Sequence, residues 1–224
     1  MSNLVLQIKN LSHTYNGTDP SLNEINLEIK EGEKVSILGN SGCGKSTLLR
    51  LIAGFEKPSS GQIFINGLEV SSKTSFLLPE KRNLGLVVQE KALFPHMTIY
   101  QNICFGIRKV PEKDKIVNEL LDLFKIDKLR DKYPHQISGG EQQRVAFARS
   151  MAPEPSFLML DEAFSALDLT LKKSLDREIS DIFTSKKSTV LIVTHDPEEA
   201  SELTDRQLTM NNGQLIYSHS FRSF

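Results

Sequence analysis

A glycine-rich segment constrains this chain more than any other feature. It lies between an apolar run at residues 35–38 and a helix-like run at residues 48–53, and it consists of Gly39, Asn40, Ser41, Gly42, Cys43, Gly44, Lys45, Ser46 and Thr47. Glycines let the backbone turn so that successive N–H groups face one anion, and the following helix adds its positive end. We expect a phosphate cradle, in which Lys45 reaches the β and γ phosphates of a nucleotide and the Ser46 hydroxyl binds Mg²⁺. A glycine-rich turn with an incidental lysine is the alternative.

Two acidic residues close another apolar run at residues 157–160. Asp161 and Glu162 stand at its carboxyl end, where open α/β sheets place their ligands. Asp161 suits the Mg²⁺ shell, and Glu162 suits the polarisation of water that attacks the γ phosphate, because phosphoryl transfer depends on positioning and charge stabilisation. Alone, such a pair is as often a loop start or a helix cap. The phosphate cradle upstream favours the catalytic interpretation.

A third motif precedes a helix-like segment at residues 145–149. Ser138 and Glu141 match the Ser-x-x-Glu capping box of a helix N-terminus. A cap does not require the two adjacent glycines, Gly139 and Gly140, which allow close backbone approach to another anion at the positive end of the helix. We therefore predict a second phosphate contact here, with a simple helix cap as the alternative.

Hydrophobic periodicity predicts two kinds of sheet. Alternating segments at residues 4–8, 25–29 and 62–70 predict antiparallel strands, and Asn66-Gly67 in the last of them is a strong hairpin signal. Compact apolar runs predict strands buried on both faces of a parallel sheet. These runs lie at residues 35–38, 84–88, 157–160 and 189–193. Between Pro111 and Lys132 the apolar residues recur at helical spacing, which predicts a helical insertion.

Composition limits the classes of function. The chain has 224 residues and a formal net charge of −1, which gives no broad basic field, so we expect no nucleic-acid partner. Cys43 and Cys104 alone form no disulfide framework. No apolar run approaches the roughly 20 residues that a bilayer span needs, and the N-terminus has no secretory pattern, so we expect a cytoplasmic protein. His13, His96, His135 and His219 show no zinc-ligand spacing with the two cysteines, so we expect no zinc site.

The order of the three motifs resembles the nucleotide-binding subunits of ABC transporters, over essentially the whole chain. The resemblance implies an α/β fold with a P-loop NTPase core of mostly parallel sheet, an N-terminal antiparallel β subdomain and an inserted helical subdomain. It further implies one domain at residues 1–224, with the core at about 1–88 and 150–224 and the helical part at about 89–149. In this family two subunits form a head-to-tail dimer, which would place each ATP between one phosphate loop and the partner's Ser138, Gly139 and Gly140.

The same resemblance assigns further site residues. Tyr15 would stack on adenine, and Gln89 would sense Mg²⁺ and the attacking water. Asp168 would communicate across the dimer, and His195 would contact the γ phosphate. Each has a simpler alternative, because Tyr15 suits a surface aromatic and Gln89 a polar strand end. His195 precedes a helix start with Asp196 as its cap, and the resemblance alone makes it catalytic.

Two departures from the family pattern stand out. The family motif is Leu-Ser-Gly-Gly-Gln, whereas this chain has Ile137 and Glu141 at its two ends. Glu141 favours the helix dipole but adds negative charge near a phosphate, so we hypothesise a weaker ATP-bound dimer or a pH-dependent closure. The subgroup most similar in appearance usually carries an additional β-rich regulatory domain, which we expect this chain to lack.

That subgroup comprises importer ATPases for ferric iron, polyamines and similar solutes, and residues 89–103 and 133–135 carry the resemblance. It implies ATP and Mg²⁺ as cofactors, a second ATPase subunit, transmembrane permease subunits and an external solute-binding protein. The location would be the cytoplasmic face of the inner or plasma membrane. Ferric iron is one expected solute, with polyamines or another solute as alternatives. A candidate apolar docking patch consists of Leu93, Phe94, Met97 and Ile99.

Other classes of function remain open at this level. A soluble ABC ATPase of DNA repair, translation or cluster assembly typically carries two such modules or long inserted arms, and this sequence has neither. A noncatalytic regulatory subunit is disfavoured by the joint presence of Lys45, Asp161, Glu162 and His195. An exporter module is also compatible, because transport direction lies largely in the membrane subunits.

Overall fold

The structure is a computed structural model that describes residues 3–17, 20–89, 92–165 and 169–217. Within these residues the strands form two sheets, one of four strands and one of six. The four-stranded sheet is antiparallel, in the order β2-β1-β4-β5. Its strands are β1 (Leu4–Thr14), β2 (Pro20–Lys30), β4 (Ser60–Ile65) and β5 (Leu68–Ser71). Asn66 and Gly67 both have positive φ, 49° and 78°, which confirms the predicted hairpin turn between β4 and β5.

The six-stranded sheet has the order β10-β9-β3-β8-β7-β6. Its strands are β3 (Lys34–Leu38), β6 (Leu84–Val88), β7 (Phe157–Asp161), β8 (Val190–Thr194), β9 (Arg206–Asn211) and β10 (Gln214–Tyr217). All neighbours pair in parallel except β10, which is antiparallel to β9. The four predicted parallel strands are confirmed, with β8 displaced by one residue. The sequence prediction missed β9 and β10.

Helices connect the strands and cover the larger sheet. The α-helices are α1 (Lys45–Ala53), α2 (Ile99–Cys104), α3 (Lys113–Leu123), α4 (Gly139–Met151), α5 (Leu169–Ser185) and α6 (Pro197–Leu203). Short 3₁₀ turns lie at Pro79–Lys81, Phe105–Ile107, Asp127–Leu129 and Pro134–Gln136. The predicted helical insertion is confirmed as α3, and α2, α3 and α4 all lie between β6 and β7 in the chain. The boundaries of a helical subdomain at residues 89–149 stay a prediction.

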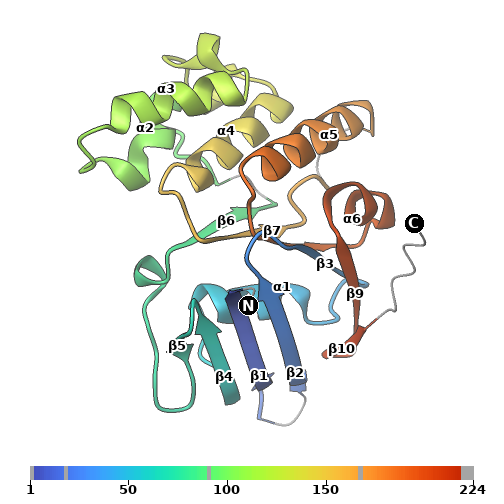
Figure 1. Ribbon diagram of the computed structural model, residues 1–224. Coiled ribbons are helices and arrows are strands. Elements are labelled where there is room, and N and C mark those ends of the chain that lie inside the picture. Colours follow the sequence, from blue (N-terminus) through green and yellow to red (C-terminus); the bar gives the residue numbers. More distant parts are fainter. Residues whose placement is uncertain (1–2, 18–19, 90–91, 166–168, 218–224) are drawn as a thin grey trace.

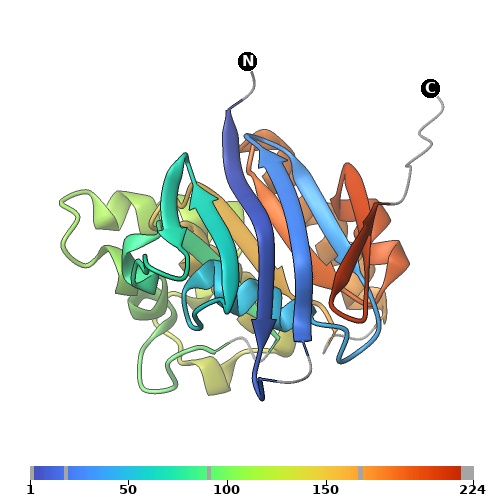
Figure 2. The same ribbon diagram turned by 90° about the horizontal axis from the view of Figure 1, so that it is seen from below.

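The larger sheet separates two hydrophobic cores, as the alternation along β7 shows. Phe157 and Met159 join the core that contains α1 and the antiparallel sheet. Leu158 and Leu160 face the opposite way, into the core formed with α2 to α5. Figure 1 shows α2 to α5 above the larger sheet, and α1 and the antiparallel sheet below it, and Figure 2 shows α1 behind the antiparallel strands. A strand buried on both faces reads as a continuous apolar run, which explains why these strands were predictable.

A buried arginine fixes the carboxyl end of α1. The guanidinium of Arg82, whose exposed fraction is 2%, donates from Nη1 to the carbonyls of Leu51 (2.9 Å) and Ile52 (2.8 Å). It also donates from Nε to the Leu77 carbonyl and from Nη2 to the Val70 carbonyl. Burial lowers the pKa of Arg82 to about 10. The cation binds carbonyls of the last turn of α1, where the helix dipole favours positive charge, so it holds α1, and with it the glycine-rich loop, against the rest of the chain.

A buried carboxyl on α5 makes stability depend on pH. Burial raises the pKa of Asp176 from its ordinary 3.8 to about 7. A raised folded-state pKa means that the folded chain binds more protons between these values, so the contribution to stability falls as pH rises from about 4 to about 7. Asp176→Asn should therefore gain thermal stability over the wild type as pH rises from about 5 to about 8, as melting temperatures would measure. An equal difference in melting temperature at both pH values would contradict this expectation.

No helix in the described residues combines the length and the apolar character needed to cross a membrane.

Candidate nucleotide site

The glycine-rich loop joins β3 to α1 and takes a form that its glycines permit. Gly42 and Gly44 have φ of 82° and 111°, a region that L side chains rarely adopt. A Cβ on Gly44 would also lie 2.6 Å from the Ser21 carbonyl oxygen. Gly44 is the N-cap of α1 and has no side chain. The first N–H groups of this helix therefore donate no capping hydrogen bond to a side chain of the N-cap residue. Such a helix start is a ready anion site.

The two strands missed by prediction support this loop from one side. The N–H of Gly213, in the turn between β9 and β10, donates to the Cys43 carbonyl at 2.9 Å. A Cβ on Gly39 would lie 2.6 Å both from the Met210 carbonyl oxygen and from the Cys43 sulfur. Cys43 itself is buried and free of disulfide. The loop is thus held tightly between α1 and the β9–β10 hairpin.

Lys45 places a buried cation inside the loop. Its Nζ donates to the carbonyls of Gly39 (2.6 Å) and Asn40 (3.0 Å), and the residue is 4% exposed. The same Nζ lies 3.9 Å from Oε1 of Glu162. A loop of backbone N–H groups with an ammonium at its centre attracts a polyphosphate. This geometry agrees with the role that the sequence predicted for Lys45.

Ser46 and Asp161 meet from α1 and β7. The Ser46 hydroxyl donates to Oδ1 of Asp161 at 3.2 Å. Burial raises the pKa of Asp161, and the Ser46 hydrogen bond opposes that effect. A hydroxyl and a carboxylate are the hard oxygen ligands that Mg²⁺ prefers, and this ion usually takes its other ligands from phosphate and water. The residues present therefore fit a Mg²⁺ ion, whose charge would also favour the ionised carboxylate.

Glu162 lies between a cation and a histidine. Oε2 of Glu162 lies 3.3 Å from Nδ1 of His195, which follows β8. The Glu162 backbone is left-handed, with φ of 48°, and its N–H donates to the Val193 carbonyl at 3.0 Å. Left-handed backbone costs a non-glycine residue about 1–2 kcal/mol, so the surrounding strands must hold it there. The carboxylate is partly exposed and can contact a water molecule at this edge of the sheet.

Gln89 reaches the same edge from the next strand. It follows β6 directly and is exposed, and Val88 before it pairs with Asp161 of β7. Because β3, β6, β7 and β8 are parallel, the residues after their carboxyl ends gather at one edge. The phosphate loop, the two acids, Gln89 and His195 therefore lie at one edge of the sheet, and their roles stay predictions. Asp168 lies outside the described residues.

Tyr15 lies beside the start of α1. Its hydroxyl donates to Oε2 of Glu56 at 2.8 Å and lies 3.3 Å from Oγ1 of Thr47. The Tyr15 ring makes an edge-to-face contact with the His13 ring, with centroids 4.8 Å apart, and Tyr15 is 59% exposed. An exposed aromatic face next to the phosphate loop suits the predicted stacking on a base. Sequence reasoning missed Glu56, which holds the Tyr15 hydroxyl, because no local pattern links residues so far apart.

The third motif caps α4. The Ser138 side chain accepts the N–H of Glu141, while Oε2 of Glu141 accepts from the Ser138 N–H (2.7 Å) and hydroxyl (2.8 Å). The predicted capping box is confirmed. Within the described residues no hydrogen bond or ion pair joins Ser138, Gly139 or Gly140 to the loop at residues 39–47. The second phosphate contact stays a prediction.

Replacing Glu141 should test the charge at this helix start. The hydrogen bonds from Ser138 lower the pKa of Glu141, so the carboxylate stays ionised near neutral pH and its cap weakens only on acidification through the folded-state pKa. A glutamine at this position keeps an accepting oxygen, so Glu141→Gln should change ATP hydrolysis at neutral pH by less than about threefold, as each exposed charge has a small effect. Phosphate release at neutral pH measures this. A gain or loss above tenfold would show that the carboxylate itself controls the site.

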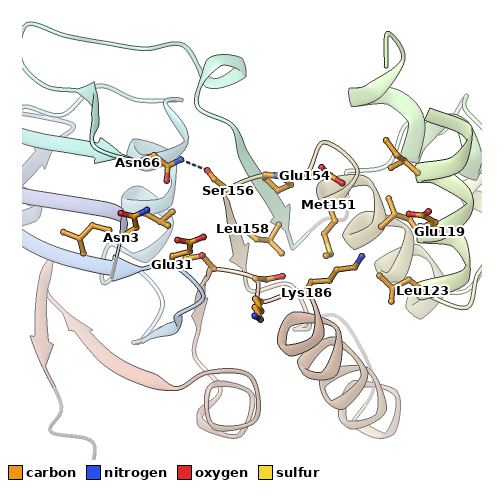
Figure 3. A pocket seen from close by; sticks show the side chains of 18 of the residues that line it. Asn3, Glu31, Asn66, Glu119, Leu123, Met151, Glu154, Ser156, Leu158 and Lys186 are labelled. Carbon is orange, nitrogen blue, oxygen red and sulfur yellow. Dashed lines mark hydrogen bonds between the residues drawn. The ribbon is translucent and has the colours of Figure 1, made fainter. Parts of the chain in front are cut away.

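A large cavity lies away from these residues. Its volume is about 1090 Å³, and it is lined at the amino ends of β1 and β7 by Asn3, Ser156 and Leu158. Figure 3 shows Asn66 and Ser156 on one side of it, joined by a 3.0 Å hydrogen bond, and Glu119 on the other. The phosphate loop lies at the carboxyl ends of the parallel strands, so this cavity is not the nucleotide site. No residue of the predicted site lines it.

The fold and the loop define a nucleotide-binding protein of the phosphate-loop class. A family model described as ABC transporter matches residues 22–165. The sulfate/thiosulfate import ATP-binding protein CysA of Pectobacterium atrosepticum is 44% identical over 98% of this chain and 70% of its own length. The putrescine transport ATP-binding protein PotG of Escherichia coli is 43% identical over 95% of this chain and 56% of its own length. The chain belongs to the ABC transporter family, as an ABC-type ATPase domain.

Solved structures agree with this assignment. The structure of cbiO1 from Clostridium perfringens, described as part of the ABC transporter complex cbiONQ, has a TM-score of 0.85 and 31% identity, covering 96% of this chain and 87% of its own. A dimeric post-hydrolysis structure of the ATP-binding cassette MJ0796 with ADP and Pi has a TM-score of 0.83 and 31% identity, covering 98% of this chain and 100% of its own. The predicted fold class and family are confirmed. The chain spans between 56% and 70% of the length of the two curated relatives named above.

Proposed function

We propose that this ABC ATPase hydrolyses ATP to drive solute import through a membrane permease. The observation that supports the chemistry most strongly is the convergence of Lys45, Asp161, Glu162 and His195 at one sheet edge. The import role rests on relatives that are named as import or transport ATP-binding proteins and that match nearly the whole chain. The protein would lie at the cytoplasmic face of the membrane through its permease partners.

In this proposal each side chain has one task. Lys45 binds the β and γ phosphates, and Tyr15 stacks on the adenine. Ser46, Asp161 and Gln89 hold Mg²⁺, which would neutralise charge on the phosphates. Glu162 accepts the proton of the water whose oxygen attacks the γ phosphorus, while the bond from that phosphorus to the bridging oxygen breaks and ADP leaves. His195 stabilises the transferred phosphate.

The second half of each site comes from a partner subunit. Ser138, Gly139 and Gly140 start α4, and their helix N-terminus suits a γ phosphate held by the other chain's loop. A head-to-tail pair would then close on two ATP molecules, with Asp168 communicating between the sites, and reopen after hydrolysis. Closure would move the helical region against the permease, and a solute-binding protein outside would deliver the cargo.

The relatives favour a different solute from the one expected first. Ferric iron was the expected cargo, but the named relatives are sulfate/thiosulfate and putrescine proteins, so iron is not supported. We propose sulfate/thiosulfate or a polyamine as the imported solute. Uptake of labelled sulfate, thiosulfate and putrescine by cells with and without this protein would test the proposal. Loss of uptake of one of them supports it, and unchanged uptake of all three contradicts it.

A surface formed by the segment before α2 and by the 3₁₀ turn that follows it suits the permease. Phe94 and Phe105 pack with ring centroids 4.4 Å apart, and Arg108 lies over Phe105, which is 42% exposed. Buried Asn102 accepts the Phe94 N–H and donates to the Met97 carbonyl, which fixes the segment. Of the predicted patch, Ile99 was wrong, because it is fully buried as the first residue of α2, and Leu93 is left out because it packs partly buried against the core. The proposed docking surface is therefore Phe94, Met97, Phe105 and Arg108.

A charge in the centre of this surface should release the permease. Phe105→Asp should lower recovery of the permease with a tagged copy by about tenfold or more, because buried aromatic anchors dominate interfaces. ATP hydrolysis by the isolated chain should persist, since Phe105 lies outside the nucleotide site. Ile216→Asp, at a comparably exposed apolar position on β10, is the matched control. Equal recovery with both variants would mean that the permease binds elsewhere.

A further inference from the structure

A buried cluster of charges joins α5 to α6 next to the nucleotide site. Nζ of Lys172 donates to Oδ2 of Asp196 at 2.6 Å and to Oε2 of Glu199 at 2.8 Å. Lys172, Asp176 and Glu199 are all buried. Asp176 lies one turn after Lys172 on α5 and faces the same charges. Figure 1 shows α5 and α6 side by side, and the bonds of Lys172 join them.

The cluster touches both segments that carry the proposed hydrolytic groups. Glu162 directly follows β7 and precedes α5 in the chain, and His195 lies between β8 and Asp196. These two segments meet once at the site, where Nδ1 of His195 lies 3.3 Å from Glu162. Lys172 of α5, the helix that follows Glu162 in the chain, is bonded to Asp196, which directly follows His195.

We propose that Lys172 is a positioning residue for ATP hydrolysis, which by its bond to Asp196 fixes the backbone that carries His195 relative to Glu162. This inference rests on the proposed function. The His195 ring is 58% exposed, so its place depends largely on the backbone on either side of it. Asp196 is well suited to transmit the constraint.

Asp196 is held at three points. Its N–H donates to Oγ1 of Thr194 at 3.0 Å, and its Oδ1 accepts from the N–H of Glu198 at 2.8 Å as the cap of α6. Its remaining oxygen takes the bond from Lys172. His195 is therefore enclosed between two residues, Thr194 and Asp196, that hydrogen-bond each other. Without the Lys172 bond, Asp196 would keep only its local hydrogen bonds to Thr194 and to the start of α6, so its position relative to α5, and that of His195 before it, would be less fixed.

Charge makes Lys172 difficult to replace. Asp176, Asp196 and Glu199 surround it, and Glu202 faces Asp176 from α6. Oδ1 of Asp176 and Oε1 of Glu199 have no hydrogen-bond partner in the described part of the chain. On the surface nearby, Lys173 pairs with Glu198 and Arg177 with Glu202. Without the Lys172 ammonium, buried carboxylates would face one another, which is strongly unfavourable unless they take up protons.

A double-mutant cycle with His195 separates positioning from general stability. Lys172→Met should lower kcat for ATP hydrolysis about 10- to 100-fold, with KM for ATP changed less than about twofold, because small misplacements of reacting groups reduce the rate this much. In a His195→Ala background the same change should lower kcat less than about twofold. Lys172→Arg should restore most of the rate, and Lys173→Met, the matched surface control, should have the wild-type rate. Additive effects of Lys172→Met and His195→Ala would overturn the proposal.

A second variant distinguishes a loss of positioning from a loss of folding. Lys172→Met combined with Glu199→Gln removes one of the repelling carboxylates while leaving Asp196 without its lysine. The proposal predicts that this protein folds and still has a low kcat, whereas recovery of the wild-type rate would mean that Lys172 only stabilises the fold. Phosphate release by the wild-type chain distinguishes a failure of this inference from a failure of the proposed function. If the wild-type chain releases no phosphate from ATP, the proposed function fails; if it does and Lys172→Met equals it, only this inference fails.

Discussion

Glu162→Gln should keep ATP bound while nearly abolishing its hydrolysis. The amide has the shape of the carboxylate but cannot accept a proton from the attacking water, and positioned acid–base groups contribute about 10²- to 10⁴-fold to such rates. The side chain lies 3.9 Å from Lys45 and 3.3 Å from His195, so the substitution leaves the surrounding cradle in place. We expect the ATP-bound closed dimer to accumulate.

Two readouts are needed for this variant. Phosphate release should fall by at least about 100-fold, and size-exclusion chromatography with Mg²⁺ and ATP should show more dimer than the wild type shows. Glu119→Gln, on the exposed surface of α3, is the matched control and should behave as the wild type does. A normal rate of phosphate release from Glu162→Gln would remove this residue from the hydrolytic role.

Lys45→Ala should instead weaken nucleotide binding itself. One charge-assisted contact contributes about 1.5–3 kcal/mol, which corresponds to roughly ten- to a hundredfold in affinity. The change also removes the hydrogen bonds that Lys45 donates to the carbonyls of Gly39 and Asn40. The loop therefore loses two stabilising hydrogen bonds as well as a positive charge. The combined loss should make ATP binding undetectable at concentrations that saturate the wild type.

Isothermal titration with ATP and Mg²⁺ measures this loss directly. Lys57→Ala, an exposed lysine just past the end of α1, is the control and should bind ATP as the wild type does. The melting temperature without nucleotide separates a folding defect from a binding defect. If Lys45→Ala binds ATP with wild-type affinity, the loop at residues 39–47 does not hold the phosphates.

Local patterns explain what the sequence could predict. The strands β3, β6, β7 and β8 are mostly apolar, and the glycine-rich loop lies directly between the strand-like run of β3 and the helix-like run of α1. The Ser138 cap and the Asn66-Gly67 turn are also local, because each depends on residues within one turn of chain. The convergence of the acids with Lys45 followed from parallel strands ending at one edge.

Long-range contacts explain what the sequence could not predict. Only Leu208 and Met210 of β9 are buried, and their neighbours are polar. The hydrophobic pattern of this segment therefore does not predict that it pairs with β3. The buried roles of Arg82 and Lys172 depend on partners far along the chain, which no local pattern shows. The roles given to Tyr15 and Gln89 came from the family resemblance, and they stay predictions.

The most direct test of the proposed import function is the identity of the proteins bound to this chain in native membranes. A tagged copy would be purified from detergent-solubilised membranes, and its partners would be identified by mass spectrometry. We predict recovery of a multispanning permease, which is lost with Phe105→Asp and retained with Ile216→Asp. Recovery of only soluble partners, such as ribosomes, DNA-repair factors or cluster-assembly proteins, would contradict the import function while leaving the ATPase site intact.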